Sequence, residues 1–466
     1  MAKASTKPTK GTRDFLPADL RLRAHVTDVI RGVFDAYGFE PLETPAIERL
    51  DTLMGKYGDE GDQLLFKVLR RGQPLVKGIR AAAEHIEQPD ALVTGRSGET
   101  APGAEPLLSD LGLRYDLTVP LARVYAANQS ALPSPFKRYQ IQPVWRADTP
   151  GKGRFREFYQ CDVDVVGSTS RAVETEVLAA AATCLRKLGF EDFELRLNHR
   201  GLLRAMIDVA GIPAELETAA IVAIDKLDKV GADGVLADLE RRGVEPAARA
   251  KLLALLGDDA SLDAIAKHMD DHAAGQEAIA DLREVLDLAS VGAAAEHVKF
   301  DVTLARGLGY YTGCIFEIAV KDLAGSLGGG GRYDGLIGMF LGKQVPACGL
   351  SLGLERILVV MQERGMQLGQ QLGADLVVAP VKEEDLRGCL SLCQQLRDGG
   401  LRVDLRPRGM KPGKLRQYAQ DRSVRAAAWM EPGGEDRLSL WIAEGGSTFA
   451  DVDAGTVLEH LGGGSE

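Results

Sequence analysis

The sequence predicts a multidomain protein in which an α+β core is combined with a helical insertion and a C-terminal α/β domain. The chain has 466 residues, and a domain takes roughly 100–200 residues, so two or three domains are expected. Strand patterns disappear between residues 200 and 297, where Ala, Leu, Asp and Glu dominate, and they return at Lys299. Beyond residue 373 a strand, a helix and a second strand follow one another, which is typical of an α/β domain.

The composition and charge of the chain exclude several classes of protein. Hydrophobic residues make up 45% and charged residues 26%, and the formal net charge is 56 − 67 = −11, which argues against indiscriminate binding to nucleic acid. No apolar run approaches the roughly 18 residues that cross a bilayer, and the basic N-terminus lacks the apolar stretch of a secretory signal. We therefore expect a cytoplasmic protein. Its six scattered cysteines form no CxxC pair, which favours reduced, buried thiols over a zinc site.

The N-terminal half alternates between helical and extended patterns. Apolar residues at three- and four-residue steps over 22–37 predict a helix that ends at Gly38. Residues 95–110 are rich in Gly, Pro and Ser and predict a surface loop. Residues 136–166 predict two strands joined by a turn, and residues 171–189 return to a helical pattern.

The C-terminal region begins after a boundary at residues 365–373. We expect a strand in ADLVVAP, a helix around residues 383–398 and a strand in LRVDL. Between Arg402 and Arg425 there are eight basic and two acidic residues. This local excess suits either a solvated face or contacts to phosphates, because such contacts depend on local charge within about 8–10 Å.

Polar and apolar side chains alternate along the segment REFYQCDVDVVG. Gln160, Asp162 and Asp164 share one face of the expected strand, opposite an apolar face. Taken alone, this pattern fits a half-buried strand with its polar side in solvent. However, residues 137–156 just before it hold six basic residues and one acidic residue. Guanidinium groups beside carboxylates and an amide can hold an anion next to a cation.

Three further segments contain glycines or charged residues that could contribute to a ligand-binding site. In residues 306–313, RGLGYYTG, glycines would let the backbone approach a ligand beside Arg306, although a glycine-rich turn with core tyrosines fits equally. Residues 328–334, GGGGRYD, match neither a P-loop nor a dinucleotide fingerprint, so close packing of another element is the simpler interpretation. Residues 347–357 predict a strand entering a helix, with Arg356 near the junction.

Together and in order, seven segments resemble the histidyl-tRNA synthetase family: KGTRDFLP, GFEPLETPAIE, LRYDLTVPLAR, VWRAD with GRFREFYQCDVDVVG, ARGLGYYTG, GGGGRYDGLIG and ACGLSLGLERI. They span residues 10–360 and include the three class II synthetase motifs. The resemblance implies a mainly antiparallel sheet flanked by helices. It also implies a discontinuous catalytic core at 1–198 and 299–364, a helical insertion domain at 199–298, and an anticodon-binding domain at 373–461, which matches more loosely.

The resemblance further implies an enzyme that activates L-histidine with ATP and esterifies histidine tRNA. It implies a homodimer, with Pro45 near the subunit interface, and Mg²⁺ that is bound with ATP and not by the protein alone. The residues implied for histidine are Asp116, Leu117, Thr118, Gln160, Asp164, Arg306, Tyr310 and Tyr311. The residues implied for ATP are Arg146, Asp148, Arg154, Arg306 and Arg356. Arg146 and Arg306 would grip the α-phosphate and are the catalytic candidates.

Two features depart from the family, and two rival functions stay open beside the enzyme. Gly309 stands where the family segment R-G-L-D-Y-Y has Asp, and the segment around 73–110 is longer than usual. The glycine implies altered local geometry, compensation from another residue, or reduced activity. One rival is the regulatory subunit of ATP phosphoribosyltransferase, which lacks the anticodon-binding domain and usually loses catalytic positions. The other is a synthetase-derived protein that binds tRNA without charging it.

Overall fold

The computed structural model describes residues 5–56, 58–84, 105–257, 260–305, 309–323, 325–366, 373–431 and 437–462. The chain divides into two compact units. One unit comprises Met1–Asp14 with Val26–Met366, and the other comprises Phe15–His25 with Gln367–Glu466. The three predicted domain boundaries stay predictions, because the insertion is grouped with the first unit.

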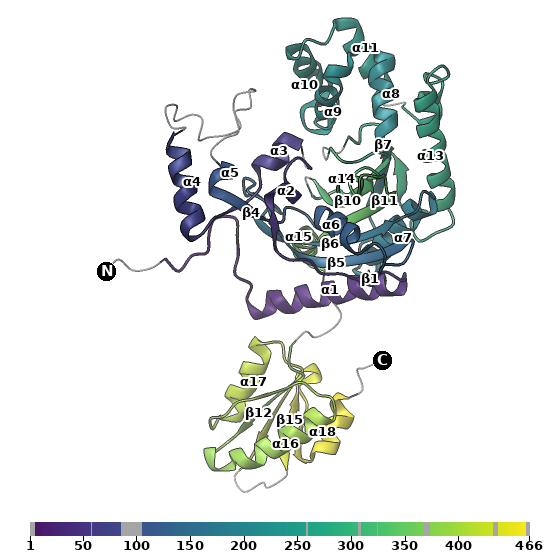
Figure 1. The fold of residues 1–466 in the computed structure, drawn as a ribbon. Helices are drawn as coiled ribbons and strands as arrows, with labels where there is room; N and C mark the ends of the chain where they lie inside the picture. Colours follow the sequence, from purple (N-terminus) through teal and green to yellow (C-terminus); the bar gives the residue numbers. More distant parts are fainter. Residues whose placement is uncertain are drawn as a thin grey trace. The chain divides into compact units, whose positions relative to one another are not determined.

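An eight-stranded sheet forms the centre of the first unit (Figure 1). In spatial order its strands are β1 (Glu40–Pro41), β5 (Phe136–Trp145), β6 (Glu157–Val166), β11 (Ala347–Gly353), β10 (Ser326–Arg332), β9 (Cys314–Val320), β7 (Phe193–His199) and β8 (Val298–Phe300). All neighbours pair antiparallel except the two edge pairs, β1 with β5 and β7 with β8. The predicted mainly antiparallel sheet is therefore confirmed.

Helices cover this sheet with apolar stripes. Helix α1 (Pro17–Ala36) ends just before Gly38, whose φ of 74° lies in the left-handed region that glycine adopts freely. Its residues Val26, Ile30 and Phe34 are fully buried. The other helices near the sheet are α6 (Thr118–Asn128), α7 (Ala172–Lys187), α14 (Gly338–Leu341) and α15 (Leu354–Glu363). The predicted helices at 22–37 and 171–189 are confirmed.

A small second sheet corrects one prediction. Its strands run in the order β2 (Ile47–Arg49), β4 (Ser109–Leu113) and β3 (Lys67–Leu69), and the nearby helices are α2 (Leu50–Leu53), α3 (Gly58–Gln63), α4 (Gly72–Glu84) and α5 (Glu105–Leu108). The loop predicted over 95–110 is wrong for residues 105–110, which form α5 and the start of β4. The physical reason is that β4 gains hydrogen bonds to strands on both sides. The rest of that predicted loop lies outside the described residues.

Between β7 and β8 the described chain is helical. The helices are α8 (Arg200–Ala210), α9 (Glu217–Ile224), α10 (Leu227–Arg241), α11 (Pro246–Leu255), α12 (Leu262–Ala266) and α13 (Ala273–Ala289), with a short 3₁₀ turn at Ala214–Leu216. Several of them extend beyond one end of the sheet in Figure 1. Helix α13 packs back on α7 and β7, so the helical segment is joined to the core by more than its two connections.

The second unit is a three-layer α/β structure. Its sheet runs β13 (Val403–Leu405), β12 (Leu376–Pro380), β14 (Ala426–Met430), β15 (Leu438–Ile442) and β16 (Thr448–Val452), and its helices are α16 (Leu386–Asp398), α17 (Pro412–Asp421) and α18 (Ala454–Leu461). Alternate residues of β12 face opposite layers. Leu376 and Val378 pack with α16 and α18, whereas Val377 and Ala379 pack with α17. The strand–helix–strand order predicted from residue 373 is confirmed.

Candidate active site

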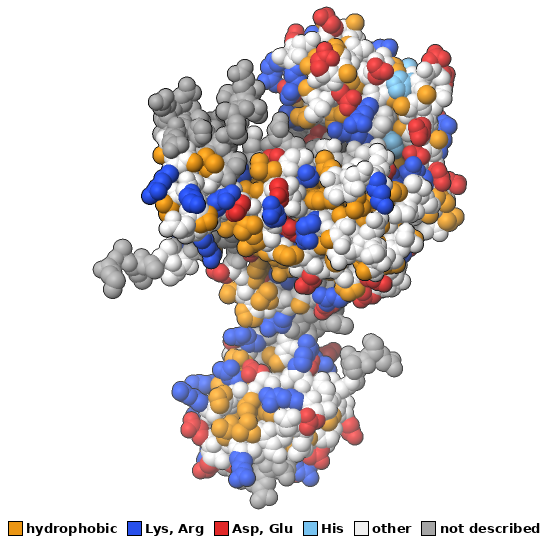
Figure 2. Space-filling model, in the orientation of Figure 1, with side chains coloured by type: hydrophobic (Ala, Val, Ile, Leu, Met, Phe, Trp, Pro, Cys, Tyr) orange, Lys and Arg blue, Asp and Glu red, His pale blue; other side chains and the backbone are white. Residues whose placement is uncertain are grey.

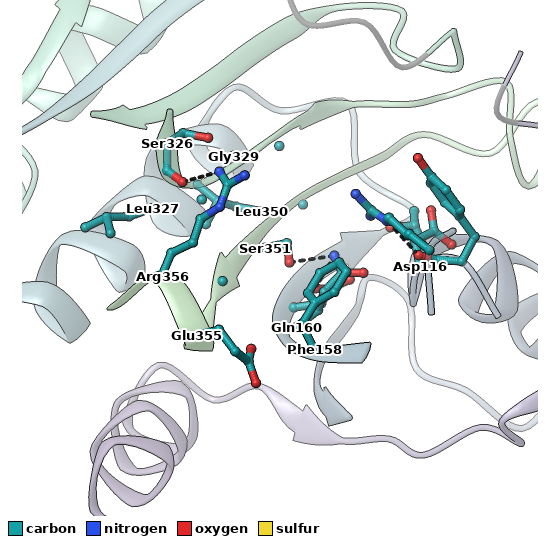
Figure 3. A pocket seen from close by; sticks show the side chains of 18 of the residues that line it. Asp116, Phe158, Gln160, Ser326, Leu327, Gly329, Leu350, Ser351, Glu355 and Arg356 are labelled. Atoms are coloured by element: carbon teal, nitrogen blue, oxygen red, sulfur yellow. Dashed lines mark hydrogen bonds between the residues drawn. The ribbon is translucent and has the colours of Figure 1, made fainter. Parts of the chain in front are cut away.

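One pocket of about 400 Å³ opens on the first unit's central sheet, between β6, β10, β11 and the segments before α6 and β9. Its lining brings together residues from segments nearly 300 positions apart in the chain, from Gly61 to Arg356. The predicted residues that line it are Asp116, Thr118, Arg146, Asp148, Arg154, Gln160, Asp164, Tyr310, Tyr311 and Arg356. In Figure 3, Glu355 and Arg356 lie on one side and Asp116 on the other, with Gln160 and Ser351 between them.

Two predicted site residues stand apart from this lining. The side chain of Leu117 is fully buried and lies outside the pocket, while its carbonyl accepts a hydrogen bond from Nη2 of Arg138 at 3.3 Å. Only the backbone of Leu117 is therefore placed to support the site. Arg306 lies outside the described residues, so its predicted role rests on the sequence.

Asp164 is an almost fully buried acid of the pocket. It accepts a hydrogen bond from the hydroxyl of Tyr333 and lies 2.8 Å from Nη2 of Arg138. Burial raises the pKa of the Asp164 carboxyl, and the positive charge of Arg138 opposes that shift. Tyr333 and Arg138 were missed at the sequence level. Arg138 is opposite Asp164 in the β5–β6 register, so the strand alternation, extended to β5, is the signal that would have found it.

An amide and a second acid point toward the same space. Nε2 of Gln160 donates to Oγ of Ser351 at 2.8 Å, and its buried Oε1 has no hydrogen-bond partner within the described part of the chain (Figure 3). Oδ2 of Asp116 accepts from the hydroxyl of Tyr310 at 3.4 Å. A buried amide oxygen with unused capacity beside a carboxylate suits a ligand that carries several N–H donors, such as an ammonium group.

Two arginines on the pocket wall are fixed by backbone carbonyls. Arg146 donates from Nε to the carbonyl of Tyr115 at 3.0 Å, and its guanidinium lies 4.2 Å from the Tyr115 ring centroid. Arg356 donates from Nη1 to the carbonyl of Ser326 at 2.6 Å (Figure 3). Each guanidinium has five N–H donors in a planar group that suits an anion, and these bonds orient it. The pocket therefore offers partners for a cation and for an anion in one space.

Glycine is required where β10 and β11 meet below the pocket. A Cβ at Gly330 would lie 1.9 Å from the carbonyl oxygen of Gly349. Since real Cβ contacts are never this short, the run at 328–331 is explained by close packing of the neighbouring strand, as predicted. Gly328, Gly329 and Gly330 also line the pocket.

We expect Gly309→Asp to leave the free energy of unfolding unchanged within about 0.5 kcal/mol, as is usual for surface substitutions. Gly309 is exposed, and a Cβ there meets no atom of the described residues within 4 Å, so the side chain can be accommodated. Urea denaturation of both proteins measures this. The matched control is Gly313→Asp, whose Cβ would lie 3.0 Å from the Arg332 side chain and should destabilise the fold. A loss above 1.5 kcal/mol for Gly309→Asp would contradict this expectation.

Within the described residues, no group of three or more His, Cys, Asp and Glu side chains is arranged to hold a metal ion, and no helix is long and apolar enough to cross a membrane. All six cysteines are buried with free thiols.

Comparisons with known proteins show which family the chain resembles. The sequence model of the histidyl-tRNA synthetase family matches residues 11–81 and 107–357, more than half of the chain. The histidine–tRNA ligase of Flavobacterium johnsoniae is 40% identical over 90% of this chain and 91% of that protein, and the one of Gloeobacter violaceus is 39% identical over 91% of each. The crystal structure of histidyl-tRNA synthetase from Nostoc sp. PCC 7120 is similar with a TM-score of 0.78 and 27% identity, over 99% of both chains.

Proposed function

The chain belongs to the histidyl-tRNA synthetase family, and on that premise we propose that it activates L-histidine with ATP and transfers the histidyl group to the 3′ end of histidine tRNA. The single observation that carries the proposal is one pocket in which partners for histidine and for a phosphate lie together. Asp116, Gln160 and Asp164 supply the first set, and Arg146 and Arg356 supply the second. The reaction is inferred from the residues of this pocket, because a fold by itself does not determine a function.

Histidine recognition requires partners at both ends of the amino acid. The orphan Oε1 of Gln160, with Asp116 and Thr118, would accept from the α-ammonium group. Asp164 and Tyr311 would hydrogen-bond the imidazole, with Tyr310 beside them. Gln160 and Asp164 are four residues apart on one strand, about 13 Å along it at most, which lets one meet the amino group and the other the ring. A site built this way rejects analogues without those groups by roughly 10⁴–10⁵.

The first chemical step needs no protein nucleophile. An oxygen of the histidine carboxylate forms a bond to the α-phosphorus, and the bond from that phosphorus to the β-bridging oxygen breaks, releasing pyrophosphate. Arg146 and Arg306 would stabilise the charge that develops on the α-phosphate, because fixed donors are most effective where charge develops in the transition state. Arg356, Asp148 and Arg154 would bind the rest of ATP.

Mg²⁺ would enter with the β- and γ-phosphates. Asp148 and Glu355, two acids of the described lining, offer the carboxylate oxygens that Mg²⁺ prefers. Oε2 of Glu355 already accepts from the backbone N–H of Tyr159 at 2.9 Å, so this donor set fits an ion shared with phosphate and not one held by protein alone. When bound, the ion neutralises charge on the departing pyrophosphate.

The second unit supports a role in tRNA binding. Three arginines of its basic run have acidic partners: Arg402 with Asp375, Arg425 with Asp375 and Arg406 with Asp404. The guanidinium groups of Arg406 and Arg422 lie 4.6 and 5.5 Å from the ring centroid of Tyr418. Positive groups beside a half-buried aromatic ring suit a single-stranded loop with phosphates and unstacked bases. Figure 2 shows acidic side chains mixed with the basic ones on this unit, which favours a selected contact over a uniformly basic surface.

Exposed apolar side chains on the small sheet support the proposed homodimer. Ile47, Leu69 and Leu111 are 47%, 61% and 37% exposed on the small sheet, next to Pro45. Apolar side chains that are exposed together on one small sheet favour a partner that covers them. A cytoplasmic location is part of the same proposal, since the substrates of translation are found there.

We expect the purified protein to exchange labelled pyrophosphate into ATP only when L-histidine is present, and to charge histidine tRNA. Histidinol, which lacks the attacking carboxylate, should support no exchange and is the matched negative control. Binding of tRNA without histidine-dependent exchange would contradict the enzyme and favour the tRNA-binding rival. Absence of both activities would favour the regulatory-subunit rival.

A further inference from the structure

Three buried acids crowd the amino-acid end of the pocket. Asp162 and Asp164 lie two residues apart on the same face of β6, and Asp116 faces them from the segment before α6. Each is 2% exposed. Burial raises the pKa of Asp162 and Asp164, and their mutual repulsion adds to the shift of Asp162. Carboxylates in this arrangement cannot all stay ionised unless a positive charge compensates them.

That positive charge is Arg138 on β5. Its side chain is fully buried and lies outside the pocket lining, so it cannot contact a ligand in the pocket. Nη2 lies 2.8 Å from Oδ2 of Asp164 and 4.0 Å from Oδ2 of Asp162. The guanidinium is held by two neutral acceptors, with Nη2 donating to the carbonyl of Leu117 at 3.3 Å and Nη1 to Oε1 of Gln140 at 3.2 Å. The guanidinium of Arg138 therefore compensates the charge of two acids from outside the pocket lining.

Building on the proposed function, we propose that Arg138 is a positioning residue for histidine recognition: it holds Asp164 ionised and turned toward the imidazole site, and it divides its charge between Asp164 and Asp162. The hydroxyl of Tyr333 fixes the other oxygen of Asp164. Arg138 and Tyr333 together determine where the carboxylate points. An ionised, fixed carboxylate accepts a ring N–H, whereas a protonated one presents an O–H to the same place.

The charged and titratable groups that face Asp164 set the pH dependence. They are Arg138, Asp162, Asp116, Tyr333 and Cys348. In the part of the chain that the structure describes, Arg138 is the only cation among these groups, so its removal shifts the Asp164 pKa further upward. The ionised fraction of Asp164 at neutral pH then falls and recovers as the pH rises. Comparing variant with wild type at each pH cancels the titration of histidine itself.

The experiment compares Arg138→Met with wild type by pyrophosphate exchange and by calorimetric binding of L-histidine from pH 6 to 9. We expect the KM and Kd for histidine to rise about tenfold or more at pH 7, which corresponds to one pKa unit, while the KM for ATP changes less than about twofold. The deficit should shrink toward pH 9. Arg138→Lys, which keeps the charge, should recover most of the histidine affinity.

Asp162→Asn tests whether the charge is shared and does not depend on how well Arg138→Met folds. With one acid removed, Arg138 serves Asp164 alone, so the acidic limb of kcat/KM for histidine should move to lower pH. If the acidic limb of the Asp162→Asn profile stays where it is in the wild type, the proposal that Arg138 divides its charge between the two acids is overturned. Equal loss of histidine and ATP affinity in Arg138→Met, without recovery in Arg138→Lys, would overturn the positioning role. Absence of exchange and of histidine binding in the wild type would instead count against the proposed function.

Discussion

Replacing Arg146 with alanine is expected to lower the rate of adenylate formation by about 10²–10³, equal to about 2.7–4 kcal/mol of lost transition-state stabilisation. The structure gives a reason beyond the charge itself. The Tyr115 carbonyl binds Nε at 3.0 Å, and the Tyr115 and Phe158 rings lie 4.2 and 5.2 Å from the guanidinium. The group is therefore oriented before the substrate arrives, which avoids the cost of ordering it during the reaction.

Pre-steady-state formation of histidyl adenylate measures this loss. We expect the Kd for L-histidine to stay within about threefold, because the residues proposed for histidine are on other segments. Arg146→Lys should recover little, since lysine has a single point charge in place of the planar fork. The control is Arg204→Ala on α8, an exposed arginine that pairs with Glu217 at 2.9 Å, and it should change the rate less than twofold. An Arg146→Ala rate within fivefold of wild type would remove Arg146 from the catalytic machinery.

The parts of the site that could be predicted are those carried by local periodicity. The alternation of Gln160, Asp162 and Asp164 follows from the two-residue period of a strand, and it can be recognised without knowing which strands lie beside it. The hydroxyl of Tyr333 reaches Asp164 across 169 residues of sequence, so no local pattern reveals it. The glycines around Tyr333 were correctly explained by close packing. Their second use, as lining of the pocket, depends on the strand order of the sheet.

The error at residues 105–110 has a related cause. Gly and Pro are frequent just before this segment, and composition alone favours a loop. Strand β4 exists because β2 and β3, from residues 47–49 and 67–69, bring hydrogen-bonding partners to both of its sides. Secondary structure that depends on distant partners overrides local propensity in this way. By contrast, α1 and α7 have apolar stripes of their own and were predicted from sequence.

Gly349→Ala should have the second largest effect on activity, because the added methyl group would clash with Asp164 on the neighbouring strand. Gly349 is opposite Asp164 in the β6–β11 register, and a Cβ there would lie 1.9 Å from Oδ1 of Asp164 and 2.8 Å from the carbonyl of Val163. The carboxylate must turn away from Arg138 and Tyr333. We expect the KM for histidine to rise roughly 10- to 150-fold, since a hydrogen bond to a charged group is worth about 1.5–3 kcal/mol, with overpacking costing about 1–3 kcal/mol of stability.

Steady-state kinetics and urea denaturation measure the two effects separately. Gly32→Ala on the exposed face of α1 is the matched control, because its Cβ meets no atom within 4 Å; alanine there should raise stability by roughly 0.5–1 kcal/mol. The decisive comparison adds Asp164→Asn. If Gly349→Ala acts through Asp164, the double variant binds histidine no worse than the more damaged single variant, because the interaction is already lost. Additive losses would mean that the glycine affects histidine by another route, and that the close approach of β11 to Asp164 does not determine the position of the carboxylate.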